Sequence, residues 1–228
     1  MEHNASTTGP REIRALLFDF DGLIVDTETP SLASWQEVYR EHGRELPLER
    51  WATIIGTTAS GFDPLDYLEE LHGSIDRVAV KTRRHEHELR LLEIEGLRPG
   101  ILEYLEEAGR LGLKTSIVSS SSRQWVDRHL ARLERAEHFD EIVTADHDPE
   151  RGKPNPTLYL EALDLLGVEA AEAIAFEDSP NGVKAAKAAG IYTVAIPNRV
   201  TAMLRLDEAD LVLEELAEVP LRELLGRF

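Results

Sequence analysis

The sequence predicts an α/β fold in which helices cover a parallel β-sheet, with a helical insert after the first strand. Six short runs are rich in Val, Ile, Ala and Phe and alternate little with polar residues, which is typical of parallel strands buried on both faces. Helical patterns separate the later runs, and this alternation favours a parallel sheet with right-handed crossovers. From about residue 30 to residue 95 only helical patterns occur, so an insert interrupts the sheet there.

The strands are predicted from short apolar runs, and the helices from apolar spacing and from the prolines and glycines that bound them. The strands are expected at residues 13–18, 115–118, 142–145, 173–176, 192–196 and 211–213. Helices of the sheet region are expected at 99–111, 123–133, 157–166 and 180–189, and those of the insert at 31–42, 47–55, 64–72 and 75–93.

Each helix of the sheet region has its own signal. Residues 99–111 open with Pro-Gly, and residues 123–133 place apolar side chains three and four positions apart. The helix at 157–166 follows Pro156, whereas Pro180 occupies a first helical position and Gly190 ends that helix. An insert placed after the first strand lies above the crevice where open α/β sheets bind ligands, so the insert is expected to cover an active site.

Composition limits the classes of function. The chain has 228 residues, a formal net charge of −18, 42% apolar residues and no cysteine. Such a negative surface disfavours nucleic acid, and the lack of cysteine excludes disulfides, thiolate catalysis and cysteine-bound zinc. Residues 1–12 are polar and read as a loose tail, and no run approaches a membrane span. We therefore expect a soluble cytoplasmic protein with no nucleic-acid or membrane partner.

Carboxylates gather where two predicted strands end. Asp19 and Asp21 follow the first strand two positions apart, so in extended geometry they lie on one side of the chain. Glu177 and Asp178 end the strand before Pro180. Separately, a turn explains the first pair, and capping by Asp178 or Ser179 explains the second. Together, at one sheet edge, they would repel each other unless a hard cation such as Mg²⁺ lay between them.

Two further segments supply groups suited to a phosphate. The second strand ends in four serines, 119–122, where hydroxyl and backbone N–H groups can bind an anion. Ser121 or Ser122 could instead cap the next helix, which would leave Ser119 free. Two prolines follow Lys153 closely and favour an extended or turn backbone there, although a lysine in a loop is usually only solvated. Carboxylates, a hydroxyl and a lysine at adjacent strand ends indicate phosphoryl transfer.

The order of these segments resembles the haloacid dehalogenase superfamily, in the branch of β-phosphoglucomutase and sugar-phosphate phosphatases. The motifs are FDFDGLIVDTE, VSSSS, GKPNP and FEDSPNG, and the resemblance extends from Arg14 to the C-terminus. It implies a three-layer, Rossmann-like parallel-sheet core, the haloacid dehalogenase fold, with an inserted all-helical cap domain. The expected core comprises residues 1–29 and 96–228, and the expected cap residues 30–95.

The resemblance also implies a role for each motif residue. Asp19 would be the nucleophile that forms an aspartyl-phosphate. Asp21 would be the general acid–base, and its backbone carbonyl would bind Mg²⁺. Asp178 would be the main carboxylate ligand of Mg²⁺ beside Asp19, and Glu177 would assist directly or through water.

The same resemblance implies the phosphate site. Ser119, with Ser120, would hold the phosphoryl group, and Lys153 would bridge that group and Asp19. The implied partner is a small phosphorylated substrate, the implied cofactor is Mg²⁺, and the family habit is a monomer.

Within the family, the sequence favours a phosphatase that acts on a small phosphorylated metabolite such as a sugar phosphate. The alternative is a β-phosphoglucomutase, in which a histidine follows five residues after the aspartate of the DT pair and an arginine lies three residues after a cap glycine. Here those positions are Ser31 and Ala59. The basic segment 81–85 could supply a second phosphate site or a solvated helix face. A dehalogenase would need neither Asp21 nor a metal, and a scaffold protein would not need the complete set.

The substrate-facing side chains of the cap are the part that the sequence defines least. Asp26, Thr27 and Glu28 enter the cap, where they either face substrate or begin a helix. Six further residues could line the pocket or pack the cap: Trp35, Trp51, Thr57, Thr58, Phe62 and Arg83.

Overall fold

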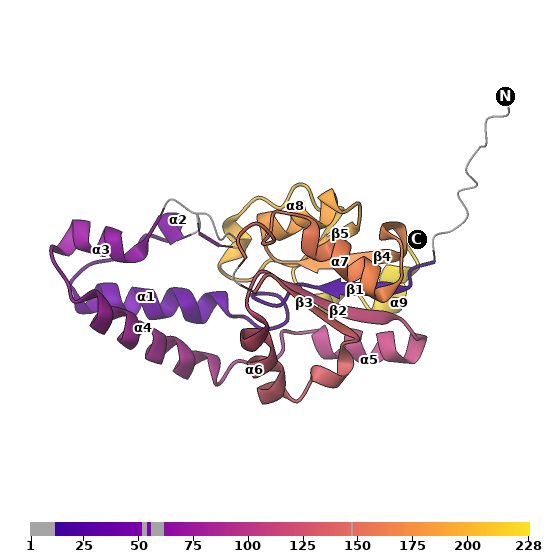
Figure 1. Cartoon of the computed structure of the whole chain (residues 1–228), viewed down its shortest axis with the longest axis horizontal. Helices are drawn as coiled ribbons and strands as arrows, with labels where there is room; N and C mark the ends of the chain where they lie inside the picture. Colours follow the sequence, from indigo (N-terminus) through magenta and orange to yellow (C-terminus); the bar gives the residue numbers. More distant parts are fainter. Residues whose placement is uncertain (1–11, 52–53, 56–61, 147) are drawn as a thin grey trace, which may run out of the picture.

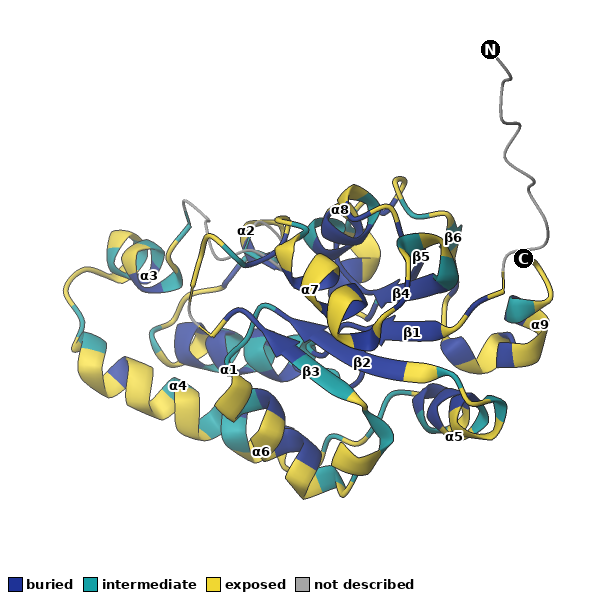
Figure 2. Cartoon of the chain, turned by 45° about the vertical axis from the view of Figure 1, so that its right-hand side comes forward, coloured by how far each residue is buried: buried dark blue, intermediate teal, exposed yellow. Residues whose placement is uncertain are grey.

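The computed structural model describes residues 12–51, 54–55, 62–146 and 148–228. Its centre is a six-stranded parallel sheet in the order β3-β2-β1-β4-β5-β6. The strands are β1 (Ala15–Phe18), β2 (Lys114–Ser119), β3 (Glu141–Thr144), β4 (Ala173–Glu177), β5 (Tyr192–Ala195) and β6 (Leu211–Val212). The central strand β1 is buried along its whole length (Figure 2), as the sequence pattern predicts for a strand covered on both faces.

Helices cover both faces of this sheet and produce the three layers of a Rossmann-like core (Figure 1). Leu16 and Phe18 point to one face and pack with α5 (Ile101–Leu111), α6 (Arg123–Leu133) and α9 (Leu221–Leu225). Ala15 and Leu17 point to the other face, where α7 (Thr157–Leu166) and α8 (Pro180–Ala188) lie. Alternate residues of one strand thus supply two separate cores, because side chains in a strand alternate between the faces.

The insert forms a separate group of helices beside the sheet (Figure 1). It contains α1 (Glu28–Glu41), α2 (Leu48–Trp51), α3 (Pro64–His72) and α4 (Arg77–Leu92), and α1 packs along α4. The chain leaves the sheet and returns at one place, since Val25 bridges to Leu97. No strand is assigned to the described residues between β1 and β2.

The predicted elements agree with the structure except at their ends. The helices at 64–72, 123–133 and 157–166 have the predicted bounds, and six strands occur where six were expected. The helix expected at 47–55 was wrong in length, since α2 ends at Trp51 and Ile54 and Ile55 lie in a turn. Residues 1–11 of the predicted tail lie outside the described residues. None of the described helices has the length and apolar character that a membrane span requires.

Candidate active site

The carboxyl ends of three neighbouring strands meet at one cavity of about 300 Å³ between the sheet and the insert. β1 lies between β2 and β4, so Asp19, Ser119 and Asp178 reach the same sheet edge although they are far apart in sequence. The loop that follows β3 brings Lys153 to the same place. The cavity is lined by Asp19, Asp21, Thr27, Glu28, Ser31, Ile54, Ile55, Glu88, Ser119, Ser120, Ser121, Trp125, Lys153, Asp178 and Ser179.

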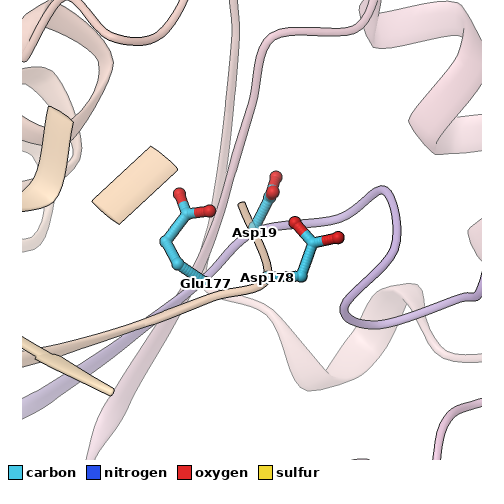
Figure 3. A group of neighbouring side chains, drawn as sticks. All are labelled: Asp19, Glu177 and Asp178. Carbon is cyan, nitrogen blue, oxygen red and sulfur yellow. The ribbon is translucent and has the colours of Figure 1, made fainter. Parts of the chain in front are cut away.

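Three buried carboxylates lie together on the floor of this site. Oxygen atoms of Asp19, Glu177 and Asp178 lie within 4.8 Å of one another, and Figure 3 shows the three side chains extending toward the same side of the strand ends. Burial, and then the charge of Glu177, raises the pKa of the Asp19 carboxyl group despite the opposing effect of Lys153. Burial, and then the charge of Asp19, raises the pKa of Asp178. A cation at this point would relieve that repulsion.

Lys153 forms ion pairs with two of these carboxylates. Its Nζ lies 2.7 Å from Oδ1 of Asp19 and 2.7 Å from Oε1 of Glu177, and its side chain is 3% exposed. Burial alone lowers the pKa of Lys153, but the charges of Asp19 and Glu177 outweigh burial and raise it. The ammonium group therefore stays charged, so the alternative of a solvated loop lysine is excluded. The hydroxyl of Ser120 helps to place the loop by accepting the Lys153 N–H at 3.0 Å.

The Glu177 carboxylate is held in place by two neighbouring side chains. Its Oε1 pairs with Lys153 and accepts a hydrogen bond from the buried Tyr159 hydroxyl, while Oε2 is buried without a hydrogen-bond partner in the described structure. Gly182 makes this position possible, because a Cβ built there would lie 1.7 Å from Oε2. Glu177 thus connects the lysine to the carboxylate cluster, a contact that its predicted role as an assisting metal ligand does not include.

Asp178 remains free to face the cavity because Ser179, rather than Asp178, caps α8. The Ser179 hydroxyl accepts the N–H of Gly182 at 3.2 Å. Asn198 donates its side-chain amide to Oδ2 of Asp178 at 2.7 Å, a contact that the sequence reasoning missed. Gly22 has a φ of 77°, and a Cβ there would lie 2.2 Å from the same oxygen, so glycine is required for this close approach.

Arg98 joins the return from the insert to the loops around Asp178. Its guanidinium donates to the carbonyl of Gly22 at 2.6 Å, to that of Ile196 at 3.1 Å and to that of Pro197 at 2.9 Å. Burial lowers the pKa of Arg98. These contacts fix the backbone that carries Asn198 relative to the loop that carries Asp21.

Asp21 lies apart from the carboxylate cluster and accepts hydrogen bonds at both oxygens. Thr27 Oγ1 donates to Oδ1 at 3.0 Å and Trp125 Nε1 donates to the same oxygen at 2.8 Å. Ser121 Oγ donates to Oδ2 at 2.6 Å. Asp19 and Asp21 therefore have different surroundings, one beside a lysine and acids and the other among neutral donors.

Ser122 caps α6 by accepting the N–H of Trp125 at 3.3 Å, one of the two predicted alternatives. Ser119 is not left entirely free, because its Oγ accepts the N–H of Ser121 at 3.0 Å. That hydroxyl is buried and lies 3.4 Å from Oδ2 of Asp21. The Ser119 hydroxyl can therefore donate its proton either to Asp21 or to a bound anion.

Comparison with known proteins identifies the family. Residues 16–196, which include all of these strand ends, match the model of the haloacid dehalogenase-like hydrolases. The chain belongs to this family. It is 48% identical over 214 residues to YhcW of Bacillus subtilis strain 168, covering 93% of this chain and 96% of the relative. It is 34% identical over 210 residues to hexitol phosphatase A of Escherichia coli K12, covering 90% and 93%.

A solved structure of the same family has a similar fold. The HAD family hydrolase of Deinococcus radiodurans, crystallised with bound phosphate and sodium, superposes with a TM-score of 0.74 at 28% identity. The alignment covers 91% of this chain and 93% of that chain. The resemblance inferred from the four motifs is thereby confirmed at the level of family and fold.

For the described side chains that could either line the pocket or pack the insert, the structure favours the second alternative or exposure to solvent. Trp35 and Trp51 pack in the core of the insert, and Phe62 lies beside Tyr67. Arg83 is exposed and pairs with Glu41. These four residues do not line the cavity, and Thr57, Thr58 and Ala59 lie outside the described residues. The lining side chains of the described insert are Glu28, Ser31, Ile54, Ile55 and Glu88.

The three residues that enter the insert have separate tasks. Asp26 helps to begin helix α1 and does not face the substrate side, since its carboxylate accepts the N–H of Thr29 at 3.0 Å and the Thr29 hydroxyl at 2.7 Å. Thr27 contacts Asp21, and Glu28 faces the cavity. Burial, followed by the charges of Asp21, Asp26 and Glu88, raises the pKa of Glu28 to about 8.

Replacing Glu28 with Gln is expected to stabilise the protein at pH 9 more than at pH 5. Folding raises the pKa of Glu28 from 4.5 to about 8, so the folded state retains a proton that the unfolded state has lost. The free energy of unfolding therefore falls as the pH rises from the unfolded-state pKa of Glu28 to its folded-state pKa. The substitution removes this loss. The Glu28 side chain is partly exposed, so solvent screening reduces the effect and we expect about 1–2 kcal/mol. Urea unfolding at both pH values measures it.

The exposed Glu86→Gln variant is the matched control, because Glu86 also lies on the insert but outside the cavity. It should change stability equally at both pH values. An equal effect of Glu28→Gln at pH 5 and pH 9 would contradict the raised pKa.

Proposed function

We propose that this protein is a Mg²⁺-dependent phosphatase that hydrolyses a small phosphorylated metabolite, such as a sugar or polyol monophosphate, through an aspartyl-phosphate on Asp19. The observation that carries the proposal is the placement of Asp19, which is buried beside the Lys153 ammonium group and next to Asp178 at the end of the cavity. Relatives named as phosphatases, including hexitol phosphatase A, support the reaction class.

The residues present fit a hard divalent cation. Asp19 and Asp178 offer carboxylate oxygens whose pKa values are raised, and Glu177 lies close enough to assist. The backbone carbonyl of Asp21 would complete the protein ligands, as the family resemblance implies. Carboxylate and carbonyl oxygens with room for water and a phosphate oxygen suit Mg²⁺. When bound, the cation would offset negative charge on the transferring phosphoryl group.

Two carboxylates would divide the chemistry. An Asp19 oxygen attacks phosphorus while the bond from phosphorus to the leaving oxygen breaks, and Asp21 gives that oxygen a proton. Ser119 and Lys153 hold oxygens of the phosphoryl group, so they favour the charge that develops there. Asp21 then takes a proton from water, which attacks phosphorus and releases phosphate and the Asp19 carboxylate.

The insert would act as the cap over this reaction, with residues 30–95 as cap and residues 1–29 and 96–228 as core. Lys153 is the one cationic side chain that lines the cavity in the described part of the chain. Arg84 is engaged elsewhere, since it pairs with Glu88 at 2.9 Å and lies 5.5 Å from the ring centre of Trp35. Residues 52–53 and 56–61 contain no Lys, Arg or His. These features favour a substrate with one phosphate over the bisphosphate that a mutase must bind.

The test is phosphate release from a panel of hexitol, hexose and glycolate monophosphates, with Mg²⁺ and with excess EDTA. Wild-type protein should release phosphate from at least one compound only when Mg²⁺ is present. Asp21→Asn should bind Mg²⁺ as wild type does but lose about 10²–10⁴-fold in turnover, the usual contribution of a general acid–base. Conversion of β-glucose 1-phosphate to glucose 6-phosphate without phosphate release, or wild-type turnover by Asp21→Asn, would overturn the proposal.

A further inference from the structure

Trp125 is the one aromatic side chain of the described structure that both lines the cavity and donates a hydrogen bond to a carboxylate in it. We propose that Trp125 is a positioning residue: its indole N–H fixes Oδ1 of Asp21, so that Oδ2 exchanges the proton with the leaving group. This inference rests on the proposed phosphatase activity. It assigns a task to a residue that belongs to none of the four motifs.

The donors around Asp21 divide its two oxygens into a fixed one and an exchangeable one. Oδ1 accepts the indole N–H of Trp125 at 2.8 Å and the Thr27 hydroxyl at 3.0 Å. Oδ2 accepts the Ser121 hydroxyl at 2.6 Å and lies 3.4 Å from the Ser119 hydroxyl. A hydroxyl can rotate toward another acceptor, whereas an indole N–H points only where its ring points. Oδ2 is therefore the oxygen that can exchange a hydroxyl partner for the substrate, and it faces Ser119.

The indole itself is held from two directions. Trp125 lies in the first turn of α6, where the Ser122 hydroxyl accepts its backbone N–H. Its ring packs edge-on against His129 with ring centres 4.4 Å apart, and His129 in turn lies 6.1 Å from Phe20. His129 is buried, and burial followed by Arg132 lowers its pKa, so a neutral ring supports the indole. Phe20 lies between the two aspartates in sequence, which ties this packing to the segment that carries them.

A fixed proton donor matters only where the leaving oxygen needs a proton. As the bond from Asp19 to phosphorus forms and the bond from phosphorus to oxygen breaks, an alkoxide leaving group must take a proton from Oδ2 of Asp21. A nitrophenolate is stable without one. The loss of the indole N–H should therefore slow the reaction of alkyl phosphates while sparing p-nitrophenyl phosphate, a distinction that a general disturbance of the fold would not produce.

The experiment compares kcat/KM of wild type and Trp125→Phe for p-nitrophenyl phosphate and for the best alkyl monophosphate of the panel. Phenylalanine keeps an aromatic ring on the same helix face as His129 and removes the donor together with part of the ring volume, a loss of volume that the Trp35→Phe control below shares. We expect kcat/KM to fall about tenfold or more for the alkyl phosphate, the size of a lost hydrogen bond to a charged group. For p-nitrophenyl phosphate we expect a change below about twofold. An equal loss for both substrates, or no loss for either, would overturn the proposal.

A double-mutant cycle with Asp21→Asn separates positioning from an independent effect. If Trp125 acts through Asp21, Trp125→Phe should cause no further loss for the alkyl phosphate in the Asp21→Asn background. Additive losses would overturn the proposal. Trp35→Phe is the matched control, because Trp35 packs in the insert, and it should leave the ratio of the two kcat/KM values unchanged. If wild type hydrolyses no alkyl monophosphate, or Asp21→Asn lowers kcat/KM equally for both substrates, the proposed function fails instead.

Discussion

Asp19→Asn is expected to lower phosphate release by at least about 10⁴-fold, because the amide cannot attack phosphorus and Glu177, the other carboxylate beside Lys153, does not line the cavity. The same change should keep or raise thermal stability. The pKa of Asp19 is raised, so its ionised form is disfavoured in the folded protein, and a neutral amide removes part of the repulsion from Glu177 and Asp178. Enzyme assays and thermal unfolding measure the two effects on one sample.

Asp164→Asn is the matched control for this prediction. Asp164 lies exposed on α7 outside the cavity, so its replacement should leave turnover within about twofold of wild type, as is usual for a surface substitution. Substantial turnover by Asp19→Asn would exclude Asp19 as the nucleophile. A fall in both activity and stability would show that the residue acts chiefly in folding.

Lys153→Met is expected to reduce both activity and stability. Loss of the ammonium group removes a cation from the transferring phosphoryl group, which should lower kcat/KM by about 10²–10³-fold. It also leaves Asp19 and Glu177 without their buried partner, 2.7 Å from each carboxylate, and breaking a buried ion pair costs about 3–5 kcal/mol. Steady-state kinetics and urea unfolding give the two quantities.

A second substitution separates the two tasks of Lys153. Lys153→Met combined with Glu177→Gln removes one uncompensated charge, so it should regain much of the lost stability without regaining activity. Lys187→Met is the control, because Lys187 pairs with Asp210 at 2.6 Å with its side chain about a third exposed. That pair should contribute about 0–1 kcal/mol. Near wild-type kcat/KM for Lys153→Met would contradict the catalytic task.

Much of the core could be predicted from the sequence because it depends on local signals and on one topological rule. Parallel strands place their carboxyl ends at one edge, so aspartates that follow β1 and β4 had to meet there. The same rule brings Ser119 from β2 to that edge. Asn198 follows β5 and could have been found in the same way, since it too comes shortly after a strand.

The remaining contacts of the site and the insert depend on how the helices pack against one another, which a short sequence motif does not predict. Trp125 reaches Asp21 only because α6 begins beside the end of β2. Arg83 and Arg84 are neighbours in a basic segment, yet each pairs with a different glutamate of the insert. The sequence indicated no chemistry for Glu28, because its raised pKa arises first from burial under the folded insert and then from carboxylates that include Glu88 on a different helix.

Chemical trapping of the intermediate tests directly whether Asp19 is the residue that is phosphorylated. Wild-type protein turning over substrate with Mg²⁺ is quenched rapidly and treated with borohydride, which reduces an aspartyl-phosphate to homoserine, and the peptide that begins at Ala15 is then sequenced by mass spectrometry. Homoserine is expected at position 19 in samples that contain both substrate and Mg²⁺, and aspartate at position 21. Homoserine at position 21, or unmodified aspartate at position 19 during turnover, would contradict this expectation.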